Sequence, residues 1–311
     1  MAKVVLFMLC LISLDAALST AENVDYTFGS SRVRFLGKSP NFQIYPNTSL
    51  SSYLQLRFSK FEERDSSDNK VQGHSVESLA SADPAWTAGN TTLSDGTNFT
   101  YVRMTLNPAN CTGFKANCSG NNAGRRMLAA PSSTSTNATV SVTLYFGLDQ
   151  NTTFPYGLNK TVSVSKGGFK FNVEYRDWPF CNDSNVLGME IDLLIKGDTA
   201  AQANVSTATD GAQVLSVPLG DNTNSNIYFA NYAYEAKNGT RNMSVGVTLA
   251  SSSSKSTVTL RLPNPAPNTT VYYDPTVTVS TQNGQGGSAT GIQTTVLSAL
   301  LATLLSSLLL A

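Results

Sequence analysis

The sequence predicts an all-β protein, a β-sandwich of many short antiparallel strands. Three observations support this prediction. Apolar and polar residues alternate with a period of two, turn residues separate these runs at roughly ten-residue spacing, and no amphipathic helical pattern occurs between residues 22 and 280. Strands with one apolar face can bury it when two sheets pack together, which favours a sandwich over a barrel.

The alternation is clear in the run from Tyr53 to Ser59, where Leu54, Leu56 and Phe58 share one face. Further alternating runs lie at 100–106, 140–146, 169–176, 187–196, 243–249, 258–262 and 271–279. Between residues 107 and 137 the pattern gives way to Asn, Gly, Ser, Thr and Pro. This stretch is either a long surface loop or a boundary between two sandwich halves.

The N-terminus has the pattern of a signal peptide, predicted at residues 1–21. Lys3 supplies a positive charge, Val4 to Leu14 form an apolar segment too short to span a membrane, and small residues follow. Cleavage is expected after Ser19 or Ala21. The β-rich ectodomain is then predicted at residues 22–280.

The C-terminus has the pattern of a glycosylphosphatidylinositol (GPI) anchor signal. Residues 296–311 are apolar and uncharged, and residues 281–295 form a small and polar linker before them. We expect the lipid at Gly286, with Gly284, Gly287 and Ser288 as alternatives, and removal of the tail. The other interpretation is a short type I membrane span, but the tail is shorter than the roughly 20 residues this needs and no basic residue follows it.

Charge excludes one class of partner. The chain has 21 Lys and Arg against 21 Asp and Glu, so its formal net charge is zero. Without a basic field, nucleic acid is not expected as a partner. The low content of charged residues, 14%, suits a folded and exported glycoprotein.

N-glycosylation sequons, Asn-X-Ser/Thr, occur about twice as often as this composition gives by chance. They predict a surface coated with glycans, although an Asn- and Thr-rich composition also generates sequons. The asparagines are Asn47, Asn90, Asn98, Asn110, Asn117, Asn137, Asn151, Asn159, Asn182, Asn204, Asn238, Asn242 and Asn268.

Three cysteines remain once the signal peptide removes Cys10: Cys111, Cys118 and Cys181. In an oxidising compartment one disulfide and one leftover cysteine are expected. Cys111 and Cys118 can close a short loop, or Cys181 can join one of them and tie the two halves of the chain together. No Cys and His spacing predicts zinc, so neither a metal nor a cofactor is expected.

The most distinctive run is Phe169 to Ile195, in which Asp177-Trp178-Pro179-Phe180-Cys181 joins two strands. Trp178 and Phe180 are expected to cap the end of the sandwich, and the alternative is a ligand platform on Trp178. Together with Asn69 to Trp86, this run resembles a group of uncharacterised secreted proteins of the skeletal organic matrix of stony corals. The resemblance implies an extracellular location in calcifying tissue and no site residues. Because the chain has no acidic tract, association with mineral would proceed through glycans or protein partners.

An enzyme is not expected. The one histidine, His74, lies in a polar run near a turn and is predicted to be on the surface, and no G-X-S-X-G motif accompanies it. Paired carboxylates could serve a glycosidase. They are Glu62 with Glu63, Asp65 with Asp68, and Glu190 with Asp192. The last pair is expected to be solvated on a polar strand face, and Asp65, Asp68 and Asn69 to be a plain turn rather than a calcium site.

A carbohydrate- or protein-binding, receptor-like module is the alternative function. Asn226 to Lys237 is predicted to place Tyr228, Ala230, Tyr232 and Tyr234 on one strand face, either as a ligand surface or as a row that faces the core. The leading hypothesis is a GPI-anchored, N-glycosylated protein of the cell surface or extracellular matrix, with a structural or adhesive role that includes a biomineral matrix. Its expected partners are the outer membrane leaflet through the lipid, and matrix proteins or glycans.

Overall fold

The computed structural model describes residues 18–19, 23–28, 31–46, 51–79, 84, 86–92, 98–111, 113–115, 118, 137–147, 152–155, 161–164, 168–196, 203–220, 223–236, 240–251 and 255–281. The apolar part of the predicted signal peptide, the predicted GPI-attachment residues and the apolar tail lie outside these ranges. Most of the 107–137 stretch does too. No helix in the described part is long and apolar enough to span a membrane.

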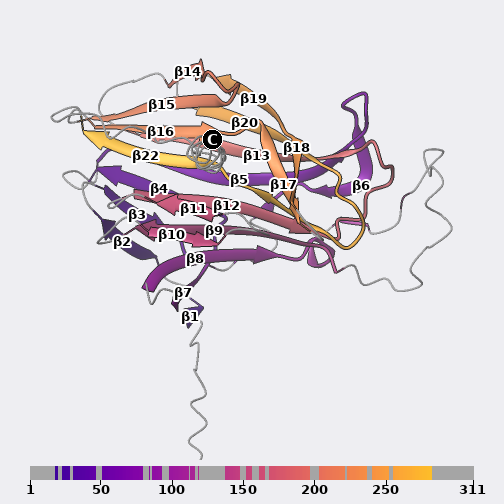
Figure 1. Cartoon of the computed structure of the whole chain (residues 1–311), viewed down its shortest axis with the longest axis horizontal. Coiled ribbons are helices and arrows are strands. Elements are labelled where there is room, and N and C mark those ends of the chain that lie inside the picture. The colour runs from indigo at the N-terminus through magenta and orange to yellow at the C-terminus, as the bar shows by residue number, and fades with distance from the viewer. Residues whose placement is uncertain are drawn as a thin grey trace, which may run out of the picture.

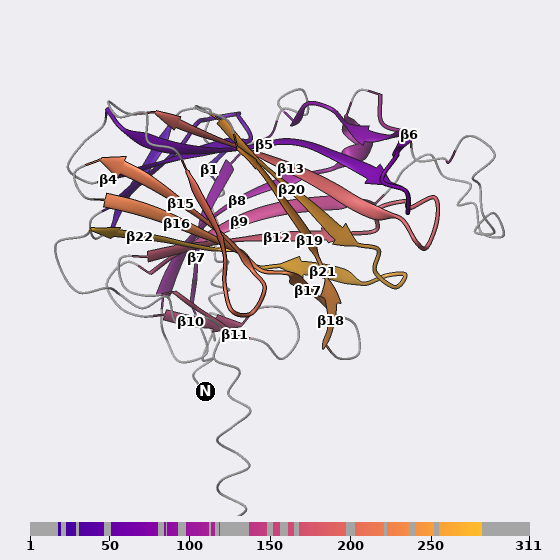
Figure 2. The ribbon, with the colours of Figure 1, turned by 90° about the horizontal axis from the view of Figure 1, so that it is seen from above.

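Two antiparallel sheets pack against each other, so the predicted β-sandwich is confirmed (Figures 1 and 2). The larger sheet has twelve strands. Its main order is β1 (Leu18–Ser19), β7 (Trp86–Thr92), β8 (Asn98–Leu106), β9 (Thr139–Gly147), β12 (Gly168–Arg176), β22 (Thr276–Thr281), β16 (Thr223–Phe229), β15 (Gln213–Gly220) and β14 (Asn204–Thr207). The other three strands, β21 (Thr270–Tyr273), β17 (Tyr232–Ala236) and β18 (Thr240–Ser244), extend from β12.

The smaller sheet has eight strands. Its order is β19 (Gly246–Ser251), β20 (Lys255–Pro263), β13 (Val186–Lys196), β5 (Tyr53–Arg64), β4 (Asn41–Pro46), β3 (Ser31–Phe35) and β2 (Val24–Phe28). β6 (Lys70–Val76) also pairs with β5. A separate hairpin of β10 (Thr152–Pro155) and β11 (Thr161–Val164) completes the described strands, and one 3-10 turn lies at Pro108–Asn110.

The core follows the alternation in the sequence. Leu54, Leu56 and Phe58 of β5 are fully buried, and the residues between them are more exposed. Side chains from both sheets form one hydrophobic cluster, in which Trp86 of β7 packs against Phe35 of β3 with ring centroids 5.0 Å apart. The period-two pattern therefore predicted the core-facing positions correctly, because each strand presents one face to the opposite sheet.

The strands on either side of the 107–137 stretch are direct neighbours. β8 and β9 pair in continuous register, with Leu106 opposite Val140, and both residues belong to the common core. The sheet therefore continues across this long connection.

β5 contains an irregularity that changes which residues point inward. Lys60 pairs with Glu190 and Phe58 with Ile191, so no residue of β13 lies opposite Ser59 in the strand register, although the Ser59 hydroxyl donates to the Glu190 carbonyl at 3.1 Å. An extra residue in one strand reverses the alternation beyond it. Phe61 and Glu63 consequently face the interior, and Glu63 is completely buried.

Candidate functional site

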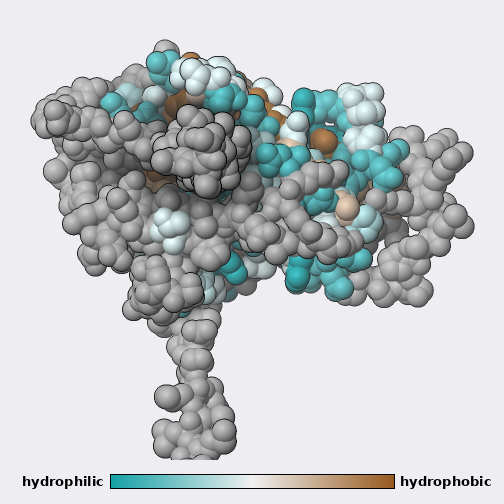
Figure 3. Space-filling view, in the orientation of Figure 1, coloured by the Kyte–Doolittle hydropathy of each residue, from teal (hydrophilic) through white to brown (hydrophobic). Residues whose placement is uncertain are grey.

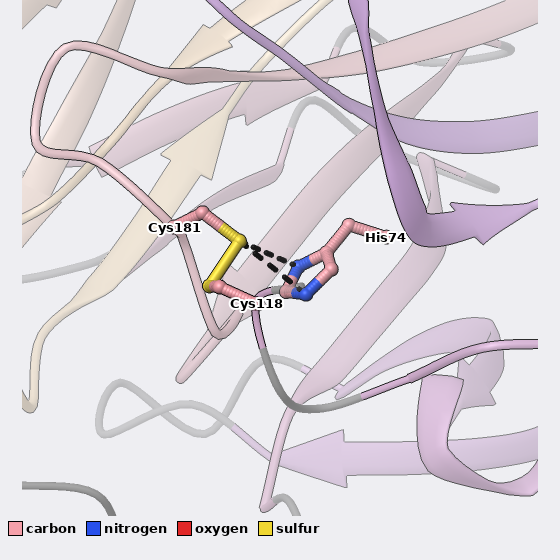
Figure 4. A group of neighbouring side chains, drawn as sticks. All are labelled: His74, Cys118 and Cys181. Atoms are coloured by element: carbon pink, nitrogen blue, oxygen red, sulfur yellow. Dashed lines mark hydrogen bonds between the residues drawn. A yellow bond between two sulfur atoms is a disulfide. The ribbon is translucent and has the colours of Figure 1, made fainter. Parts of the chain in front are cut away.

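A buried polar cluster lies where β5, β6 and the β12–β13 connection meet (Figure 4). β5 contributes Glu63, β6 contributes His74, and Cys181 lies in the connection. The prediction that His74 is on the surface is wrong, because its side chain is completely buried. His74 has the same strand parity as buried Val76, so pairing of β6 with β5 turns both inward.

The structure joins Cys118 to Cys181 in a disulfide, while Cys111 is free and buried. The prediction of one disulfide and one leftover cysteine is therefore confirmed. Of the pairings left open, the structure has the one in which Cys181 joins Cys118 rather than the short Cys111–Cys118 loop. The bond spans 63 positions and fixes the 118 segment to the β12–β13 connection. Neither chain spacing nor composition could choose between the pairings.

Glu63 organises the cluster through both carboxylate oxygens. Oε1 accepts hydrogen bonds from the Cys181 backbone N–H, at 2.7 Å, and from the Asn185 side chain. Oε2 lies 2.9 Å from His74 Nδ1, but it receives no well-directed hydrogen bond. We therefore treat the His74 contact as a close approach of two ionisable groups rather than as a hydrogen bond.

The other ring nitrogen of His74 faces sulfur. Nε2 lies 3.4 Å from Cys181 Sγ, and Figure 4 shows the ring beside the disulfide. A ring nitrogen of His74 and the sulfurs of Cys118 and Cys181 lie within 4.8 Å of one another. Because thiolates rather than disulfide sulfurs bind metal ions, this group is not a metal site while the disulfide is intact.

Aromatic side chains close the cluster. Trp178 and Phe180 are buried, which fits the predicted cap rather than an exposed platform. Phe114 makes an edge contact with Trp178 at 5.3 Å and lies 5.9 Å from the His74 ring. The Lys115 N–H donates to the Gly73 carbonyl at 2.8 Å, which places Phe114 against β6. Gly73 has a φ of +81°, a conformation that glycine adopts readily.

The sequon asparagines form a second candidate site, distributed over the surface. All those whose side-chain burial is described are exposed: Asn90, Asn110, Asn137, Asn182, Asn204, Asn242 and Asn268. In contrast, the buried asparagines Asn41, Asn172 and Asn185 are not in sequons. The side chains of the others lie outside the described residues: Asn47, Asn98, Asn117, Asn151, Asn159 and Asn238.

The tyrosine row does not form one face. β16 ends at Phe229 and β17 begins at Tyr232, so the predicted single strand is wrong. Tyr228 is partly buried and hydrogen-bonded to Asp210, and Tyr234 is buried. Asn231 lies between the two strands, and β16 pairs with β15 whereas β17 pairs with β21. These rings therefore do not make a common exposed platform.

The acidic turn after β5 is held by its own hydrogen bonds. Asp65 Oδ1 accepts from the backbone N–H groups of Ser67 and Asn69, at 2.9 and 2.8 Å. The Asn69 bond is the main reason that the pKa of Asp65 is lowered. Asp68 pairs with Arg261 at 2.5 Å. Protein groups thus engage both carboxylates, as expected for the plain turn.

Glu190 and Asp192, on the outer face of the smaller sheet, are paired rather than simply solvated. Lys60 Nζ lies 2.9 Å from Glu190. Asp192 is only 4% exposed and contacts Arg57 and Lys255 at 2.5 and 2.9 Å. The solvated interpretation is therefore wrong for Asp192. Burial raises the pKa of its carboxyl, but Lys255 and Arg57 together lower it by more, so the pKa lies below its usual value.

A buried ion pair that the sequence did not reveal lies on the larger sheet. Lys170 of β12 and Asp274, just after β21, are 2.7 Å apart and 6% and 5% exposed. The Asn172 amide, oriented to suit its neighbours, donates to the other Asp274 oxygen at 2.8 Å. Burial raises the pKa of Asp274 despite the opposing effect of Lys170.

Comparison of the chain with protein-family models and with curated proteins finds no match.

Proposed function

We propose that this chain is a GPI-anchored, N-glycosylated protein of the cell surface or extracellular matrix, with a structural or adhesive role and no catalysis. The observation that carries the proposal is the separation of asparagines by burial. Each sequon asparagine whose side-chain burial is described is exposed, whereas the asparagines described as buried lie outside sequons. A glycan requires an exposed acceptor, so this distribution is compatible with a heavily glycosylated folded chain.

The disulfide supports an exported location. Cys118–Cys181 stabilises the connection between distant segments, and such bonds persist in oxidising compartments and are rare in the reducing cytosol. A signal peptide at residues 1–21 would deliver the chain to such a compartment.

The surface chemistry supports a glycan-coated protein. Val205 is the one large hydrophobic side chain classed as exposed among the described residues. Figure 3 shows mainly hydrophilic colours on the described part of one face. We therefore place adhesion in glycans and polar surfaces rather than in an apolar interface, and the coral resemblance extends the proposal to a skeletal organic matrix.

Phosphatidylinositol-specific phospholipase C treatment of expressing cells tests the anchor. The protein should be released, and mass spectrometry of the released chain should place the lipid remnant at Gly286 or at a neighbouring small residue. A variant that lacks residues 296–311 is the control, and it should enter the medium without treatment. Retention of Leu308 to Ala311 in the mature surface protein would contradict the anchor.

The same sample tests glycosylation. Peptide mapping after enzymatic removal of N-glycans should find modified asparagines among the exposed sequons. Asn41 and Asn185, which are buried and not in sequons, serve as internal controls. An unglycosylated chain located in the cytosol would refute the proposal.

A further inference from the structure

We propose that the Cys118–Cys181 disulfide is a thiol-exchange site, at which a small thiol such as glutathione forms a mixed disulfide with Cys118. This reactivity goes beyond an anchored structural or adhesive role. It rests on two features of the cluster: the unequal exposure of the two cysteines, and the Glu63–His74 pair, whose imidazole is in contact with the sulfur of Cys181.

Exposure selects the sulfur that is attacked. Cys181 is 5% exposed, whereas Cys118 is partly exposed. A thiolate must approach a disulfide sulfur directly, so access is one determinant of which sulfur reacts. Cys118 is therefore the electrophilic atom, and Cys181 is the leaving group.

The buried side of the bond is equipped to receive negative charge. His74 Nε2 lies 3.4 Å from Cys181 Sγ, and Glu63 lies 2.9 Å from the other ring nitrogen. A protonated imidazole beside a sulfur stabilises the thiolate, and a thiolate that is more stable leaves a disulfide faster. Glu63, in turn, stabilises the positive charge on His74 and also fixes Cys181 through its backbone N–H.

The exchange is balanced without any further reactant. The thiolate of glutathione bonds to Cys118 Sγ as the S–S bond breaks, and the electron pair goes to Cys181 Sγ. A proton on His74 Nε2 then faces the new thiolate. The thiolate of a second glutathione can attack the sulfur of the glutathione bound to Cys118. This step releases oxidised glutathione and leaves the protein with two reduced cysteines.

The charged groups that face His74 are few among the described residues. Glu63 of β5 contacts it directly, and the disulfide approaches from the β12–β13 connection. From the 113–115 segment, Phe114 packs near the His74 ring. The aliphatic part of the Lys115 side chain covers Gly73, and its Cδ would lie 3.1 Å from a Cβ placed on that glycine. The pH dependence of exchange, at a fixed concentration of glutathione thiolate, should therefore require both His74 and Glu63.

The test uses the full-length glycosylated protein with Cys111→Ala, which removes the free thiol. It is incubated with reduced glutathione between about pH 6 and pH 8, across the range in which imidazoles titrate. Reactions are quenched by alkylation, and peptide mapping locates the adduct. We expect the first adduct on Cys118 in roughly tenfold excess over Cys181. The rate of exchange, divided by the concentration of glutathione thiolate at each pH and called the corrected rate below, should rise as the pH falls.

His74→Gln should slow the corrected exchange by about tenfold at the acidic end and flatten its pH profile. Glu63→Gln keeps a similar shape and should weaken the same dependence. Ser67→Ala, in the exposed turn after β5, is a matched control that should leave the rate unchanged. Circular dichroism identifies variants that fail to fold. The ratio of Cys118 to Cys181 adducts is measured in the Cys111→Ala protein without any change at His74 or Glu63, so it tests the proposal even if those variants do not fold. An adduct mainly on Cys181, or a folded His74→Gln protein with an unchanged rate and profile, would overturn the proposal.

Discussion

Replacement of Lys170 by Met should destabilise the protein by about 3–5 kcal/mol, because it leaves a buried carboxylate without its cation. Lys170 and Asp274 are 2.7 Å apart and about equally buried. In the variant, the Asn172 amide would remain as a hydrogen-bond donor to Asp274, which does not neutralise its charge.

The pKa of Asp274 indicates how the loss should vary with pH. Burial raises this pKa in the native protein even with Lys170 present. For a carboxyl whose pKa is higher in the folded than in the unfolded state, the stability linked to it is greatest below the unfolded pKa and decreases as pH rises through the folded pKa. The defect of Lys170→Met should therefore shrink as the pH falls.

A double substitution separates the loss of attraction from the penalty of an unpaired charge. Lys170→Met combined with Asp274→Leu removes both charges, and such replacements are often neutral or stabilising. We expect the double variant to recover at least half of the free energy lost by Lys170→Met. Lys255→Met is the matched control, because Lys255 is 42% exposed and should contribute less than about 1 kcal/mol.

Urea unfolding followed by tryptophan fluorescence is a suitable assay, since both tryptophans of the chain, Trp86 and Trp178, are buried. The reasoning would be refuted if Lys170→Met lay within about 1 kcal/mol of the native protein at pH 7. It would also fail if the double variant were as unstable as the single one.

Three other substitutions test separate parts of the fold by the same unfolding measurement. Trp86→Ala should lose about 3–5 kcal/mol, since the side chain is 1% exposed and donates to the Ser39 carbonyl; a smaller change would mean that the core collapses around the site. Asp192→Asn should lose about 1–2 kcal/mol at neutral pH. The lowered pKa of Asp192 makes its contribution present above the ordinary Asp pKa and lost as pH falls through the folded one, so an equal loss at all pH values would contradict its charge pairing. Replacing Cys118 and Cys181 by Ser should cost about 4 kcal/mol for a bond spanning 63 positions, and equal stability would argue against the bond.

The strand pattern of the fold could be predicted because burial on one face leaves a period of two in the sequence. Leu54, Leu56 and Phe58 show this directly. The cluster could not be predicted, because it depends on a local exception to the same rule. Omission of Ser59 from the β5–β13 pairing reverses the alternation and turns Glu63 inward. The strand break at Asn231 defeated the tyrosine prediction in the same way, since alternation was assumed to continue across it.

Hydrophobic packing alone gives no reason for a carboxylate and an imidazole at the inward positions of β5 and β6. Phe61 lies two residues before Glu63 on β5, and Val76 lies two residues after His74 on β6, each on the same buried face. Apolar side chains at positions 63 and 74 would therefore extend the core. A buried ionisable pair instead loses hydration that its mutual attraction only partly restores. Glu63 and His74 nevertheless place one carboxylate oxygen on the backbone of Cys181 and one ring nitrogen beside its sulfur. The chemistry of that sulfur, rather than the packing of the sandwich, therefore accounts best for their presence.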